Sequence, residues 1–276
     1  LNATLDQPQL SIWYSNGSRV ELRSKREMQQ LLSKVLDTVY SKSPLLYNEL
    51  INRDVPSSQS IGGRNKLLSA MLLRESTVEL GIEKSPPEKG LYRSLLLATG
   101  IHRKKSDGTW CFTDPVESGS EQARDDIKAS IAPVWGRIIE FFESTAETPR
   151  SFEELREELV SPPYGLKAGV LPILYFAAYL VHRNELAIFE NRRFRPAFDD
   201  ESVARFIKRP DEFSFQLFKI DGFYSSIFES YSTLIAGDKN KKTILEIAKP
   251  FTRAMQGLSQ YTKATSRGLS KNAKAV

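Results

Sequence analysis

One local pattern occurs twice in this chain of 276 residues and constrains its fold more than any other feature. Each copy begins with Ser-Pro-Pro, continues through an apolar segment with helical spacing and ends in a short basic β-hairpin. The copies run from Ser85 to Phe112 and from Ser161 to Phe198. Because a winged-helix unit ends with a helix followed by a hairpin, the pattern predicts a docking module for nucleic acid or protein rather than an enzyme.

The remaining segments are read from periodicity and from turn residues. Asn16-Gly17 between two short apolar runs predicts a hairpin, and apolar residues at helical spacing predict a helix over 26–40. Further helices are expected over 44–54, 57–73, 86–99, 121–144, 151–160, 167–183 and 242–261, and short amphipathic helices are expected over 200–228. The two basic hairpins are expected over 101–112 and 186–198.

The fold class predicted from these elements is mainly α with short β-hairpins. It consists of two tandem winged-helix-like units and a C-terminal helical extension. We expect the first unit and the N-terminal hairpin within residues 1–118, a long linking helix and the second unit within 119–198, and the extension with a basic tail within 199–276.

Composition narrows the possible chemistry. The single cysteine, Cys111, excludes an intrachain disulfide, and two histidines do not supply a Cys/His zinc site. The sequence lacks the Gly-x-x-x-x-Gly-Lys-Ser/Thr pattern of a phosphate-binding loop. His102 and His182 occupy matching places in the two copies, where a helix-capping role is expected. We therefore predict no catalytic residues, no metal and no cofactor.

The same features bear on location. The longest apolar run, from Val170 to Val181, contains Pro172 and is shorter than the ~20 residues that cross a bilayer, so no membrane contact is expected. The low cysteine content favours a cytoplasmic location. The chain starts at Leu1 without a signal-peptide pattern, and both ends suggest a fragment of a longer polypeptide.

Basic residues are concentrated in the hairpins and near the C-terminus. From Asp238 onward there are nine lysines and arginines against two acidic residues, while the whole chain carries a net charge of +5. Such asymmetry favours an anionic partner, although a solvated helix face explains it equally well. The residues expected to contact phosphates are Arg64, Lys89, Arg93, Arg103, Lys104, Lys105, Arg192, Arg193, Arg195, Lys239, Lys241, Lys242, Lys263 and Arg267.

Several strings also resemble a region of known bacterial proteins. They are residues 48–53, Gly81-Ile82 through Pro86-Pro87-Glu88, residues 162–172, and Tyr261-Thr262-Lys263 with Leu269-Ser270. These strings are similar to a helical region of large, poorly characterised phage-defence or restriction-associated ATPases. The resemblance implies a defence context, in which such a region accompanies a separate P-loop module that this sequence does not contain.

Two functions remain open at this point. The first is a non-catalytic module of a larger bacterial anti-phage protein, which binds the backbone of double-stranded DNA or another nucleic acid through basic hairpins and tail. The alternative is a docking scaffold that grips the remainder of a larger polypeptide or a partner ATPase subunit.

Overall fold

The computed structural model describes residues 6–53, 55–116 and 123–218, together with residues 245, 249, 252–253 and 256–264. The elements of the N-terminal part are η1 (Pro8–Leu10), β1 (Trp13–Ser15), β2 (Ser18–Val20), α2 (Lys25–Val39), α3 (Ser58–Leu73), η2 (Val78–Gly81), α4 (Pro87–Leu91), η3 (Tyr92–Leu97), β3 (His102–Lys104) and β4 (Trp110–Phe112). The remaining elements are α5 (Asp125–Glu143), β5 (Arg150–Ser151), α6 (Phe152–Val160), α7 (Leu171–His182), β6 (Leu186–Glu190), β7 (Arg193–Arg195), α8 (Asp200–Lys208), η4 (Pro210–Glu212), β8 (Phe213–Leu217) and α11 (Gln260–Ala264).

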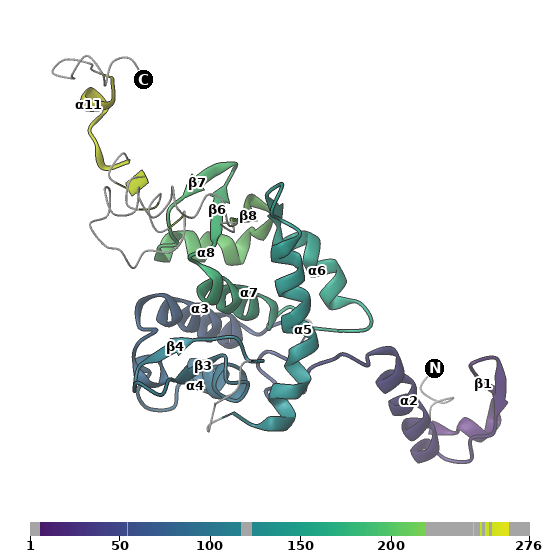
Figure 1. The fold of residues 1–276 in the computed structure, drawn as a ribbon. Coiled ribbons are helices and arrows are strands. Elements are labelled where there is room, and N and C mark those ends of the chain that lie inside the picture. Colours follow the sequence, from purple (N-terminus) through teal and green to yellow (C-terminus); the bar gives the residue numbers. More distant parts are fainter. Residues whose placement is uncertain are drawn as a thin grey trace.

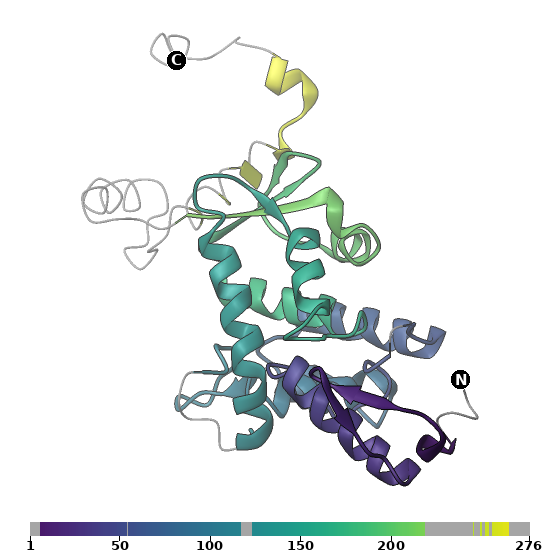
Figure 2. The same ribbon diagram turned by 90° about the vertical axis from the view of Figure 1, so that its right-hand side faces the viewer.

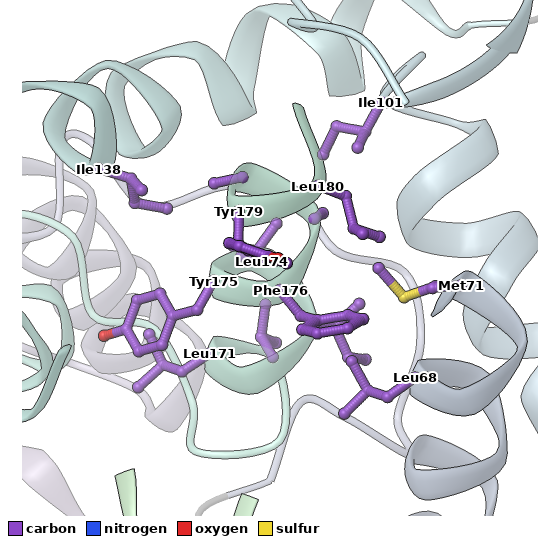
Figure 3. Packing of buried hydrophobic residues seen from close by; sticks show 14 of the residues in the cluster. Leu68, Met71, Ile101, Ile138, Leu171, Leu174, Tyr175, Phe176, Tyr179 and Leu180 are labelled. Carbon is purple, nitrogen blue, oxygen red and sulfur yellow. The ribbon is translucent and has the colours of Figure 1, made fainter. Parts of the chain in front are cut away.

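Helix α7 lies at the centre of the molecule. Nine of its twelve residues are buried, and in Figure 1 the helix lies between α3, α5 and the strands above it. Figure 3 shows Leu68 and Met71 of α3 and Ile138 of α5 pointing toward it from different directions. A helix that is apolar on every side needs partners on every side, so α7 determines where the other elements pack.

The four-stranded antiparallel sheet covers one side of α7. Its strand order is β5-β8-β6-β7, so the central pair joins β6 to β8. Strand β8 alternates buried and half-buried residues, and Phe213, Phe215 and Leu217 face the core. The Leu217 amide donates to the buried Thr145 hydroxyl at 2.9 Å, which ties β8 to the segment that follows α5.

The predicted pair of winged-helix-like units is wrong. The second helix–hairpin pattern does not end in a free wing, because β6 and β7 belong to a larger sheet whose strands β5 and β8 come from outside the pattern. The first pattern ends in a separate two-stranded hairpin, β3–β4. Both patterns contribute to one core cluster, which extends from Ile51 to Leu217. The mainly helical character agrees with the structure.

Most predicted elements are present, with two exceptions. The Asn16-Gly17 hairpin has positive φ at both turn residues, Ser57 caps α3, and Ser151 with Glu154 forms a capping box for α6. The helix expected over 44–54 is absent, and the segment expected as a helix around Phe213 is strand β8. Half of the expected helix over 242–261, and the expected short helices beyond residue 218, lie outside the described residues.

The segment at 41–53 forms an irregular strap that ends in a turn, instead of a helix. The Lys42 amide donates to the Pro163 carbonyl at 3.0 Å, and the Leu45 amide donates to the Ser130 hydroxyl at 2.9 Å. Ile51 is fully buried, and its backbone lies against Gly169. These tertiary bonds replace the local bonds of a helix, which explains why the Pro44 start signal is overridden.

Replacing Gly169 tests the close approach of the strap to residue 169. A Cβ at position 169 would lie 2.7 Å from the Ile51 carbonyl oxygen and 3.0 Å from its Cα, whereas a Cβ at Gly62 within α3 meets nothing within 4 Å. We expect Gly169→Ala to lower the free energy of unfolding by about 1–3 kcal/mol through overpacking. The matched change Gly62→Ala is expected to raise it by about 0.5–1 kcal/mol. Urea unfolding measures both, and a neutral Gly169→Ala would contradict the packing of the strap.

Candidate functional site

The first basic hairpin places its cations in two environments. His102 is fully buried and Arg103 is 8% exposed within β3, whereas Lys104 and Lys105 are exposed near the turn. The turn is shaped by Asp107, which accepts bonds from the Thr109 hydroxyl at 2.6 Å and the Thr109 amide at 2.8 Å. These bonds hold the pKa of the Asp107 carboxyl below its usual range, so the tip carries an acidic as well as a basic charge.

The basic residues of the second hairpin also have two kinds of surroundings. Asn191 and Arg192 form its turn, both with positive φ, and Arg192 and Arg193 are exposed. Arg195 instead turns toward Glu190, with which it forms an ion pair. Only the tip of this hairpin therefore presents basic side chains to solvent.

Glu190 organises the base of the second hairpin. It is 8% exposed and also accepts a bond from Arg205 of α8, whose Nε lies 2.6 Å from its Oε1. The bond from Arg205 is the main cause that lowers the pKa of the Glu190 carboxyl, and the bond from Arg195 adds to it against the effect of burial. Glu190 thus joins β6, β7 and α8.

Other predicted contact residues have different surroundings. Lys89 and Arg93 both form ion pairs with Glu79, at 2.9 Å and 2.7 Å, and Lys89 also donates to the Ile82 carbonyl at 2.8 Å. Arg64 is half-buried and lines a cavity. Lys239, Lys241, Lys242 and Arg267 lie outside the described residues, and Lys263 lies in α11, where its side chain is also outside them.

The two hairpins do not form one continuous surface. Figures 1 and 2 show the β3–β4 hairpin and the four-stranded sheet on opposite sides of α7. Of the predicted cations that the structure describes, four are exposed at the hairpin tips, namely Lys104, Lys105, Arg192 and Arg193.

The two repeats each contain a histidine–arginine pair near the end of their helix, and one residue of each pair contacts Glu75. His102 lies 2.9 Å from the Tyr92 hydroxyl through Nδ1 and 2.6 Å from the Glu75 carbonyl oxygen through Nε2. The Glu75 carboxylate accepts two bonds from Arg183, at 2.7 Å and 2.6 Å. Burial lowers the pKa of His102, which suits a neutral ring in a structural network. His102 therefore joins two segments rather than capping its own helix.

The N-terminal part forms an arm that sequence reasoning did not recognise. We define the arm as residues 6–40, which comprise η1, β1, β2 and α2. Figure 1 shows its N-terminal part extending away from the rest of the chain, and none of its residues belongs to the core cluster. Its last residues approach the body, because Tyr40 lies against Gly165 and lines a pocket together with residues of α6. Helix α2 has no buried residue, and its Leu32, Leu36 and Val39 are 54%, 44% and 41% exposed.

The apolar stripe of α2 has a symmetric spacing. Its members are Met28, Leu31, Leu32, Val35, Leu36 and Val39. The stripe reads the same in both directions about a point midway between residues 33 and 34. An antiparallel copy of the helix would therefore bring each apolar residue opposite another one. The sequence contained this signal, but helical spacing alone does not separate a core stripe from an exposed one.

Within the described part of the chain, no cluster of three or more His, Cys, Asp and Glu side chains is arranged to hold a metal ion. Cys111 is half-buried in β4. The described helices include none with the length and apolar character needed to cross a membrane.

Comparison with known proteins adds no assignment. No protein-family model, curated protein or solved structure matched this chain. The resemblance to phage-defence or restriction-associated ATPases therefore stays a prediction.

Glu190→Gln tests the structural role of the charges at the second hairpin. Because the folded-state pKa of Glu190 is lowered, its charge stabilises the fold above the unfolded pKa of about 4.3, and this contribution is lost as pH falls through the folded value. We expect the variant to lose about 1–3 kcal/mol at pH 7 in urea unfolding, and the difference to shrink below about pH 4.

The control is Glu201→Gln, which removes an 88% exposed carboxylate 3.7 Å from the same arginine, Arg205. We expect it to change stability by less than about 0.5 kcal/mol. Equal losses in the two variants would show that Glu190 does not organise the hairpin.

Proposed function

We propose that this chain is a non-catalytic protein-docking module, and that its arm pairs with the arm of a second copy. The observation that carries the proposal is the stripe of α2, which has helical spacing but no buried residue: Met28, Leu31 and Val35 are half-buried, and Leu32, Leu36 and Val39 are exposed. An amphipathic helix gains most of its stability from packing its apolar face, so a stripe with three exposed members favours a partner.

A second copy fits the stripe because of its symmetry. In an antiparallel pair, Met28 faces Val39 of the other copy, Leu31 faces Leu36, and Leu32 faces Val35. Such an arrangement is isologous, since the same surface serves both partners and the pair closes. No two like charges face each other between Arg26 and Val39 in this register, and Asp37 faces Gln30.

The remaining surface of the arm supports the same reading. Leu10, Ile12 and Tyr14 are 74%, 65% and 68% exposed near β1. Apolar patches of this kind on a soluble domain mark interaction surfaces more often than isolated exposed residues do. A pair of fifteen-residue helices is small for a permanent interface, so we expect a dimer that dissociates on dilution.

The resemblance noted in the sequence would give this pairing a context. If the chain is part of a larger defence ATPase, two arms would bring two copies of that larger protein together. The P-loop module would then lie elsewhere in the longer polypeptide, and this region would position the two copies without catalysing a reaction.

Sedimentation equilibrium tests the pairing. We expect a monomer–dimer equilibrium with a dissociation constant on the order of micromolar, which corresponds to about 8 kcal/mol. The double variant Leu32→Lys with Leu36→Lys should remain monomeric, because it places charges in the centre of the apolar stripe.

The control for this experiment is Leu73→Lys, which changes a 65% exposed leucine at the end of α3. It should dimerise like the parent chain. A parent chain that stays monomeric at a hundred micromolar, or a dimer that persists in the α2 variant, would refute pairing through the arm.

A second function, contact with a nucleic-acid backbone, is favoured by the hairpin tips. Lys104, Lys105, Arg192 and Arg193 are exposed, and cations on exposed hairpins neutralise phosphates without reading sequence. The two tips lie on opposite sides of α7, so each would contact a separate stretch of the nucleic acid.

Fluorescence anisotropy with a mixed-sequence DNA duplex tests this second function. We expect affinity to fall with salt, with a log–log slope of roughly −0.9 per phosphate contact. Replacing Lys104 and Lys105, or Arg192 and Arg193, with Ala should flatten the slope by up to about two such contacts. The control, Lys25→Ala with Arg26→Ala, removes the same charge from the arm. Slopes that are equal in all three variants would exclude the tips.

A further inference from the structure

A cavity of about 490 Å³ lies between α3, α6, α7 and α8, and the residues that line it belong neither to the arm nor to the hairpin tips. Much of its wall is apolar and includes Leu171, Phe206, Ile207 and three prolines, Pro56, Pro172 and Pro210. Its volume lies within the range of small-molecule sites in proteins, which combine apolar walls with a few polar groups.

The first polar group is the guanidinium of Arg64. No carboxylate among the described residues lies within ion-pair distance of it, and its Nε is buried without a hydrogen-bond partner. Burial is also the cause that lowers the pKa of Arg64, without opposing carboxylates. A guanidinium buried without an acceptor carries a desolvation cost that a bound anion would offset.

The second polar group is the hydroxyl of Tyr175, on the central helix. Tyr175 is 4% exposed, and its hydroxyl is buried without a partner. The ring is stacked on Phe152, with centroids 4.3 Å apart and planes 3° apart, so its position is well defined. Figure 3 shows Tyr175 beside Leu171, with its oxygen pointing away from α7. Tyr175 and Arg64 line the same cavity.

The third contribution comes from the start of α7. Leu171 and Pro172 of its first turn line the cavity, and no side chain caps this twelve-residue helix at its N-terminus. Pro172 has no N–H, and the Ile173 and Leu174 amides donate to the Val170 carbonyl at 3.1 Å and 3.2 Å. The start of α7 therefore favours an anion through the partial positive charge of the helix rather than through a set of free amides.

Other charged residues of the wall partly cancel. Glu153 forms an ion pair with Arg156 at 2.9 Å, while Lys208 and Asp211 are both exposed. Arg64 is thus the half-buried cation of the wall that lacks a carboxylate partner among the described residues.

From these observations we propose that the cavity binds a small molecule with an apolar body and one oxyanion group, either phosphate or carboxylate. Arg64 would hold the anionic group, the partial positive charge at the start of α7 would favour it, and the Tyr175 hydroxyl would donate a hydrogen bond to it. This site is independent of the arm and of the hairpin tips.

The test uses three aromatic probes on the whole chain. Benzoate and phenyl phosphate carry the anion, and benzamide is a neutral control of similar shape. Calorimetric titration measures affinity, and the Nε–H signal of Arg64 in ¹⁵N-labelled protein reports contact without any substitution. We expect both anions to bind and to shift the Arg64 signal, and benzamide to do neither.

Variants then assign the contacts. Arg64→Gln should weaken binding of the better anion by at least about tenfold, because it removes a charge-assisted bond. Tyr175→Phe keeps the stacked ring and should weaken binding by a smaller factor, while Arg192→Gln on the second hairpin should leave it unchanged.

The outcomes separate clearly. A preference for phenyl phosphate or for benzoate identifies which oxyanion the site takes. Equal binding of benzamide and benzoate, an Arg64 signal that does not move at saturating probe, or full affinity in Arg64→Gln would overturn the proposal. If Arg64→Gln does not fold, the titration of the parent chain and Tyr175→Phe decide the question. Failure of this site would leave the pairing of the arms unaffected.

Discussion

The burial of α7 on all sides is the constraint on which the rest of this structure depends. Because Val170 to Leu180 is apolar nearly throughout, the chain must cover it from every direction. Helices α3 and α5 and strand β4 contact it, and Tyr179 lies against Phe215 of the four-stranded sheet. Fully burying one large apolar side chain contributes roughly 1.5–3 kcal/mol, so a helix with nine buried residues dominates the placement of its neighbours.

The arm, in contrast, contributes no residue to this core. The core satisfies α7 and leaves α2 outside, although α2 has an apolar stripe of its own. The ion pairs of Glu79, Glu75 and Glu190 engage four basic residues of the two repeats, namely Lys89, Arg93, Arg183 and Arg195. Among the described residues, the surfaces that we propose for partners are the stripe of α2, the hairpin tips and the cavity beside Tyr175.

Local signals in the sequence predicted most elements but not their assembly. The Asn16-Gly17 turn and the caps Ser57 and Ser151 act within a few residues, so their outcomes could be read directly. Strand β8 was mistaken for a helix, although Phe213, Phe215 and Leu217 alternate as a strand does, because the sheet that requires it is assembled from distant segments. The partners of the basic residues could not be predicted either, because they lie far away in the sequence. Arg205 binds Glu190, fifteen positions away, and Arg183 binds Glu75, 108 positions away. Periodicity also could not show that the stripe of α2 lacks a partner.

Amide hydrogen exchange at two protein concentrations tests this account most directly. In dilute protein, residues 25–39 should exchange much faster than α7, because α2 has no buried residue whereas nine residues of α7 are buried. At concentrations well above the dimer dissociation constant, residues 25–39 should become protected while the exchange of α7 stays the same. Protection of α2 that equals that of α7 in dilute protein, or that does not respond to concentration, would contradict an arm that pairs with a second copy.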